Sequence, residues 1–88
     1  MKQKIFDYTA VFQKEPEGGY TVFVPALPGC VSCGETVEEA RAMIAEAIGL
    51  YIESMEELHE EVPTEEGSFI SNIHISLPYA KTPQFQAT

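Results

Sequence analysis

One long amphipathic helix is the feature that most limits what this chain can fold into. Apolar residues recur along residues 37–58 with the spacing of one stripe on a helix of 3.6 residues per turn. The stripe comprises Val37, Ala40, Met43, Ile44, Ala47, Ile48, Tyr51, Ile52, Met55 and Leu58. A single helix with one apolar face needs one apolar surface to cover, and a β-sheet supplies such a surface.

The two ends of this helix carry their own signals. Thr36 and Glu39 fit a capping box, in which the threonine caps the helix and the glutamate reaches back to the chain before it. Pro63 disfavours helical backbone at the residue before it. The sequence therefore predicts a helix that begins at Val37 and continues nearly to Pro63.

The segment before the helix predicts three strands. Residues 5–13 alternate, with Phe6, Tyr8, Ala10 and Phe12 on one face. A turn with one proline and two glycines then leads to residues 20–24, which are β-branched or aromatic and predict a hairpin. A corner at residues 25–29 contains two prolines and a glycine, and residues 30–34 are long enough for a short third strand.

A fourth strand is predicted after the helix. Residues 69–77 alternate again before Pro78, with Phe69, Ser71, Ile73, Ile75 and Leu77 on one face. The order predicts an α+β fold, a two-layer β-β-β-α-β sandwich with one long helix on one face of the sheet. The last strand is expected parallel to the first because a helical crossover joins them.

The length of 88 residues suits one domain. We expect that domain to cover residues 1–78. The remaining residues 79–88 show no periodicity and predict a flexible C-terminal tail.

Acidic residues dominate the charge of the chain. It carries 14 acidic and 5 basic residues, a net charge of −9, and 11 of the acids lie between Glu35 and Glu66. Phosphate backbones repel such a chain, so we expect no direct nucleic-acid binding by the chain alone. A basic protein partner is the natural complement of the acidic helix, and the alternative is a charge that only keeps the protein soluble.

Neither a membrane span nor a secretory signal is visible in the sequence. No apolar run approaches the roughly 18 residues that a span needs, and the first residues are polar. We therefore expect a cytoplasmic location without membrane binding. A four-stranded sheet with free edges and a partly apolar second face also predicts a homo-oligomer.

The residues that could carry chemistry form only weak patterns. Cys30 and Cys33 make one C-x-x-C, which is interpreted as ordinary strand thiols, with a redox or metal site as the alternatives. His59 and His74 have no nucleophile in a recognisable arrangement. The predicted fourth strand carries Asn72 and no acid, so a two-metal nuclease lacks ligands. We expect no catalytic residue, no metal and no cofactor.

The central stretch resembles the signature of the HicB antitoxin family. Residues 20–40 read YTVFVPALPGCVSCGETVEEA. This run matches an aromatic-rich strand, a Pro-x-Leu-Pro-Gly corner, a short strand and a Gly-[Asp/Glu]-Thr-x-x-Glu-Ala helix start. The matching positions are Tyr20, Pro25, Leu27, Pro28, Gly29, Gly34, Glu35, Thr36 and Glu39, with a structural or partner-binding role. The resemblance extends over residues 5–78.

The resemblance implies a partial ribonuclease-H-like sheet with one helix and without the nuclease carboxylates. It also implies a partner, a small basic RNA-cleaving toxin of the HicA type, which the antitoxin binds and neutralises. Many family members carry a C-terminal DNA-binding module, but only residues 79–88 follow the predicted fourth strand here.

Three hypotheses for the function follow. The first is an antitoxin-like protein that sequesters a HicA-type toxin, and the second is an orphan, self-associating regulatory domain with no toxin partner. The third is an enzyme, for which disulfide chemistry at the C-x-x-C is the least poor version. A neighbouring gene for a short basic protein favours the first, and a lone gene favours the second.

Overall fold

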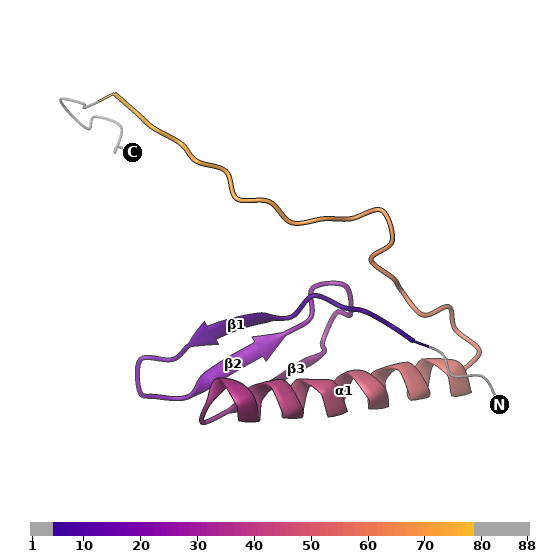
Figure 1. Cartoon of the computed structure of the whole chain (residues 1–88). Helices are drawn as coiled ribbons and strands as arrows, with labels where there is room; N and C mark the ends of the chain where they lie inside the picture. Colours follow the sequence, from indigo (N-terminus) through magenta and orange to yellow (C-terminus); the bar gives the residue numbers. More distant parts are fainter. Residues whose placement is uncertain (1–4, 79–88) are drawn as a thin grey trace, which may run out of the picture.

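Three strands and one helix make up the regular structure of this protein. The computed structural model describes residues 5–78. In chain order the elements are β1 (Val11–Lys14), β2 (Tyr20–Phe23), β3 (Val31–Gly34) and α1 (Val37–Glu57). The helix lies along one face of the sheet, which confirms the predicted α+β class with a single helix layer (Figure 1).

The sheet follows the order of the chain. Its order is β1-β2-β3, and both pairs are antiparallel. Phe12 lies opposite Val22, and Val22 lies opposite Ser32, so these three side chains share the face that α1 covers. Val22 and Val24 of the central strand and its extension are buried.

The first strand begins later than the alternation predicts. The register pairs Val11 with Phe23, so Thr9 would face Pro25, which has no N–H to continue the ladder. The backbone N–H of Thr9 instead donates to the Glu65 carboxylate at 2.7 Å, and its hydroxyl donates to the same group at 2.9 Å. The loop after the helix thus replaces a strand partner at this end of the sheet.

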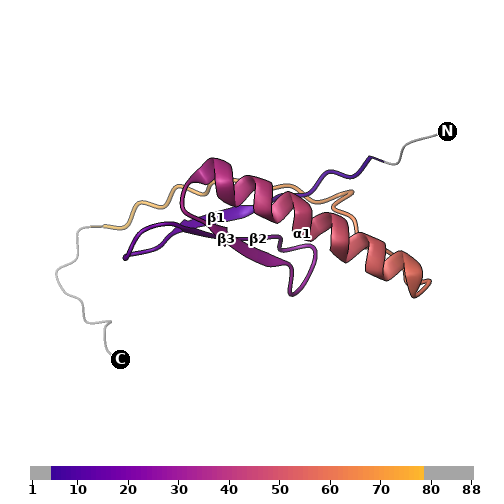
Figure 2. The same cartoon turned by 90° about the horizontal axis from the view of Figure 1, so that it is seen from below.

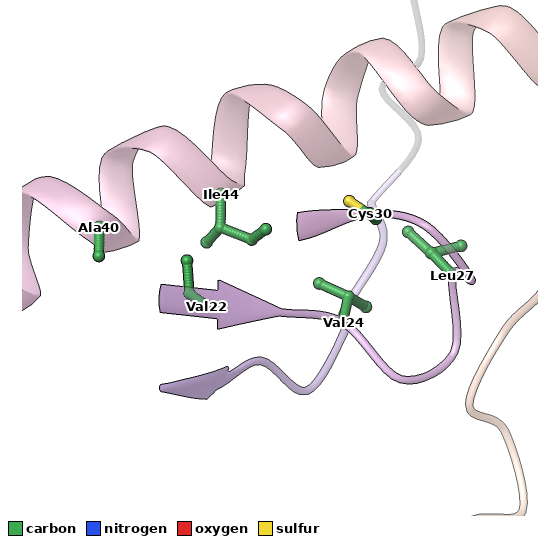
Figure 3. Packing of buried hydrophobic residues seen from close by; sticks show 6 residues of the cluster. All are labelled: Val22, Val24, Leu27, Cys30, Ala40 and Ile44. Atoms are coloured by element: carbon green, nitrogen blue, oxygen red, sulfur yellow. The ribbon is translucent and has the colours of Figure 1, made fainter. Parts of the chain in front are cut away.

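The core lies between α1, β2 and the chain that links β2 to β3. Its buried members are Val22, Val24, Leu27, Cys30, Ala40 and Ile44 (Figure 3). Gly34 permits the close approach of the helix to β3, because a Cβ there would lie 2.4 Å from the backbone nitrogen of Ala40. The helix crosses β3 and β2 (Figure 2), and its Arg41 guanidinium lies 5.8 Å from the ring centre of Phe12 on β1.

The helix ends earlier than predicted. The N–H of His59 donates to the carbonyl of Glu56 and the N–H of Glu60 donates to that of Met55, which is a Schellman motif. His59 holds the left-handed backbone conformation that this motif requires, with φ of 59°. The helix was expected to continue nearly to Pro63, but it ends at Glu57 because His59, a residue other than glycine, adopts the terminating conformation.

The predicted fourth strand is not part of the sheet. Within residues 5–78 the sheet has three strands, and residues 69–77 run away from it as extended chain (Figure 1). Their apolar side chains are exposed, with Phe69 at 88% and Ile73 at 76%. The physical cause is a turn in which Ser68 N–H donates to the Glu65 carbonyl and Gly67 has φ of +87°, while Glu65 is held at Thr9.

Two predictions about the ends of the chain concern residues beyond this range. Residues 1–4 and 79–88 lie outside the described residues. The flexible tail at 79–88 and the domain boundary at residue 78 therefore stay predictions. Among residues 5–78 no helix has the length and apolar character needed to cross a membrane.

Candidate partner-binding surfaces

The corner between β2 and β3 is built to place one leucine. Leu27 N–H donates to the Val24 carbonyl at 3.0 Å, and Cys30 N–H donates to the Leu27 carbonyl at 2.9 Å. A third bond, from Val24 N–H to the Cys30 carbonyl at 3.1 Å, closes the loop. Leu27 is fully buried as a result. The corner therefore has a structural role, because it places Leu27 in the core.

Three other motif residues, Pro25, Pro28 and Gly29, belong to this corner. Gly29 has φ of +87°, which favours glycine, and Tyr51 on α1 donates its hydroxyl to the Pro28 carbonyl at 2.9 Å. Pro25 and Pro28 are themselves exposed. Their rings are available for contact.

The helix start contains the predicted capping box with one difference. The Thr36 hydroxyl accepts a hydrogen bond from the Glu39 N–H at 3.1 Å. The Glu39 carboxylate accepts from the N–H of Glu35 at 2.7 Å, one residue before the cap. Gly34 and Tyr20 pair across the sheet next to this box, with Tyr20 packed against the core. These motif residues meet around the start of α1.

The C-x-x-C does not bring its two thiols together. Cys30 is buried in the core beneath the helix, whereas Cys33 is exposed on the opposite face of the sheet. Both are free, and burial raises the pKa of the Cys30 thiol. His59 belongs to the helix cap, and His74 lies in the extended chain far from it.

A metal centre finds no set of ligands in the same part of the chain. Over residues 5–78 no three His, Cys, Asp or Glu side chains gather closely enough to hold an ion.

One side of α1 points away from the sheet and combines carboxylates with apolar side chains. We call it the outer face. Its members are Met43, Glu46, Leu50, Glu53 and Glu57, spaced three, four, three and four residues apart. Leu50 is 60% exposed and Met43 is 42% exposed. Met43 was expected in the buried stripe but lies at its margin, and the exposed position of Leu50 was not predicted.

The charge around the outer face is almost uniformly negative. All 14 acidic residues of the chain lie within residues 5–78, where Lys14 and Arg41 are the lysine and arginine side chains. The last turn of α1 carries no basic residue to complement the helix dipole. A cationic group that binds here would reduce the repulsion among the carboxylates, and it would also interact favourably with the C-terminal end of the helix dipole.

The second face of the sheet is uncovered and partly apolar. The register places Val11, Phe23 and Val31 in one row across the three strands. Phe23 is 37% exposed and Val31 is 55% exposed. The sequence predicted a partly apolar second face, and the alternation of β2 and β3 was the signal that could have named Phe23 and Val31.

Comparison with known proteins agrees with these features. The chain matches the model of the HicB-like antitoxin of bacterial toxin–antitoxin systems over residues 8–83. It is 50% identical over 64 residues to a UPF0150 protein of Synechocystis, covering 73% of this chain and 81% of that protein. A UPF0150 protein of Thermoplasma acidophilum is 44% identical over 64 residues, covering 73% and 93%. One of Helicobacter pylori is 43% identical over 67 residues, covering 76% and 92%. The chain belongs to the HicB-like antitoxin family.

Proposed function

We propose that this protein neutralises a small basic toxin of the HicA type by binding it and covering its RNA-binding surface. The observation that carries the proposal is the outer face of α1, where carboxylates surround exposed apolar side chains in a member of an antitoxin family. A surface that binds RNA phosphates is cationic, so the same surface is complementary to this face.

The outer face offers both parts of a protein-binding surface. Leu50 and Met43 supply apolar contact area, which dominates affinity when it is buried in a partner pocket. Glu46 and Glu53 flank Leu50 on the helix and would meet lysine or arginine side chains of the toxin. In this mechanism the carboxylates take the place of substrate phosphates, and the toxin is inactivated by occlusion.

Binding is the whole of the proposed activity. The proposal includes no catalytic step, no metal and no cofactor, and the separation of Cys30 from Cys33 by the sheet argues against disulfide exchange between them. It places the protein in the cytoplasm with its toxin and assigns no operator binding to the chain alone, because its charge of −9 opposes DNA.

The test is co-expression with any small basic protein that is encoded beside this gene. If that protein stops growth, wild-type chain should restore growth and co-purify with it. The double variant Glu46→Lys, Glu53→Lys should fail in both assays. The matched control is Asp7→Lys, Glu17→Lys, which makes the same charge change at exposed positions outside α1 and should still rescue.

A kinetic measurement separates charge from apolar contact. The association rate should fall as salt rises, because opposite fields speed the encounter and salt screens them. Leu50→Ala should mainly raise the dissociation rate. A toxic neighbour that this chain neither binds nor inhibits would overturn the proposal and leave the orphan regulatory domain as the better hypothesis.

A further inference from the structure

We propose that residues 69–77 of each copy add as a strand to the free edge of β1 in a second copy, so that two chains exchange these segments. We call residues 69–77 the exchange segment. The inference is independent of the toxin, because it concerns the chain alone.

The exchange segment has a strand pattern without a strand partner. Its apolar side chains are exposed by 70% or more in every case, namely Phe69, Ile70, Ile73, Ile75 and Leu77. Phe69, Ile73, Ile75 and Leu77 alternate as on a strand with one buried face, and such a face is stable only against other apolar groups. Single exposed apolar residues are ordinary, but five of them within nine positions form an exposed apolar surface of the kind that marks an interaction site.

The connection to the helix turns the segment away from its own sheet. Glu65 is bound to both the N–H and the hydroxyl of Thr9, only five residues before the end of β1 at Lys14. The turn at Gly67 then directs the chain away from the sheet (Figure 1). The segment therefore leaves the outer edge of its own β1 without a strand partner in the sheet that the structure describes for residues 5–78.

The β1 edge is the place in the fold that such a strand fits. β1 is an edge strand, and α1 lies mainly over β3 and β2. Tyr8 and Phe12 lie on the helix side of β1 and the chain before it, and both are only half buried. A strand added there would cover these two side chains with its own apolar face, and its backbone would pair with the open edge of β1.

The charge pattern identifies the occupant as a second copy. Residues 67–78 contain no Asp, Glu, Lys or Arg, although residues 5–66 contain 14 acids. A basic toxin would be attracted by carboxylates, which the segment lacks, whereas an uncharged segment lets two acidic chains meet without bringing their carboxylates together. Reciprocal exchange also gives each copy the same contact twice, as a closed two-fold dimer requires.

The first test measures the mass of the full chain by light scattering over a range of concentrations. We expect a dimer whose affinity is unchanged or rises with salt, because salt screens the repulsion between the two bodies. Ile75→Lys on the apolar face of the segment should weaken the dimer about 30-fold or more, as loss of an interface hot spot does. The matched control His74→Lys adds the same side chain on the other face and should leave the mass unchanged.

The second test asks which copy supplies the strand. One variant carries Gln13→Cys in β1 and another carries Ser76→Cys in the segment, both with Cys33→Ser so that only buried Cys30 remains besides. After mixing, a short bismaleimide should join one variant to the other. Far-ultraviolet circular dichroism checks that every variant retains the folded body.

Three results would overturn the exchange. They are a wild-type chain that stays monomeric at all concentrations, an Ile75→Lys variant that stays dimeric, and a doubly substituted Gln13→Cys, Ser76→Cys chain that crosslinks only within itself. The first two place the contact elsewhere or nowhere, and the third shows a strand that closes on its own sheet. None of them depends on the toxin, so the proposed function can fail or succeed separately.

Discussion

The stretch from Val24 to Ala40 and the exchange segment carry equally clear sequence patterns, but the chain completes only the first. In residues 24–40 the corner, the capping box and Gly34 all find their partners within the same copy. In residues 69–77 the alternation is present and the chain is extended, yet the apolar side chains face solvent.

The difference lies in where the partner groups are. A turn or a cap is satisfied by atoms a few residues away, so the pattern alone determines the contact. A strand is satisfied by another strand, and periodicity does not say which edge or which copy supplies it. The following predictions test whether the two regions differ in this way.

The largest effect is expected at Gly34, where the two elements of the first region touch. Gly34→Ala should lower the free energy of unfolding by about 3 kcal/mol, because the added Cβ would collide with the backbone of Ala40. Gly49→Ala is the control, since a Cβ there meets nothing within 4 Å, and it should stabilise the helix by about 1 kcal/mol. Urea unfolding measures both, and equal midpoints for the two variants would contradict the close contact.

A pair of leucines compares the two regions directly. Leu27→Ala should cost about 3 kcal/mol because it empties a fully buried site in the core. Leu77→Ala, which removes a side chain that is 78% exposed, should change stability by less than about 0.5 kcal/mol under dilute, monomeric conditions. If the two variants unfold alike in dilute solution, the exchange segment is packed within one copy after all.

The cap at Thr36 should give a smaller effect. Thr36→Ala removes the acceptor for the Glu39 N–H and should cost about 1 kcal/mol without loss of the fold. Thr64→Ala in the exposed loop makes the same change without removing a cap and should be nearly neutral. Thermal unfolding of the two variants side by side is sufficient, and a neutral Thr36→Ala would show that the cap is dispensable.

The smallest effect concerns pH. Burial raises the pKa of the Cys30 thiol above 9.0, and burial together with the nearby Glu65 carboxylate raises the pKa of the Tyr8 hydroxyl above 10.0. The folded state therefore favours the neutral forms, so their contribution is complete below pH 9.0 and is lost as the pH rises through the raised values. The urea concentration at the unfolding midpoint should decrease as the pH rises through this alkaline range. Cys30→Ala should remove the part of the decrease that occurs at the lower pH values.

Much of the arrangement of β1, β2, β3 and α1 was predictable because its sequence signals are local. The capping box, the hairpin and the corner each involve residues close in sequence, and the helix stripe located Ala40, Ile44 and Ile52 in the core. The partner-binding role of the motif residues was not predictable at this level, because Leu27 and Gly34 are motif positions that the fold itself requires.

The errors came from tertiary or unusual local geometry. The end of α1 depends on a left-handed backbone at His59, and the usual sequence signal for that conformation, a glycine, is missing at this position. The late start of β1 depends on Glu65, a residue 56 positions away from Thr9. The fate of residues 69–77 depends on that same anchor, and the outer face of α1 became visible only when Leu50 was placed on the helix.

The sheet order β1-β2-β3, with α1 packed on β3, also determines the order in which contacts can form during translation. Its contacts join elements that are neighbours in the chain, so the body can fold within milliseconds once residues 11–57 are free. At the usual rate of synthesis, twenty residues such as 58–77 take about 1–4 s, so they become free of the ribosome after residues 11–57. The sheet and α1 can therefore pack before the exchange segment is free, and pairing between chains comes last.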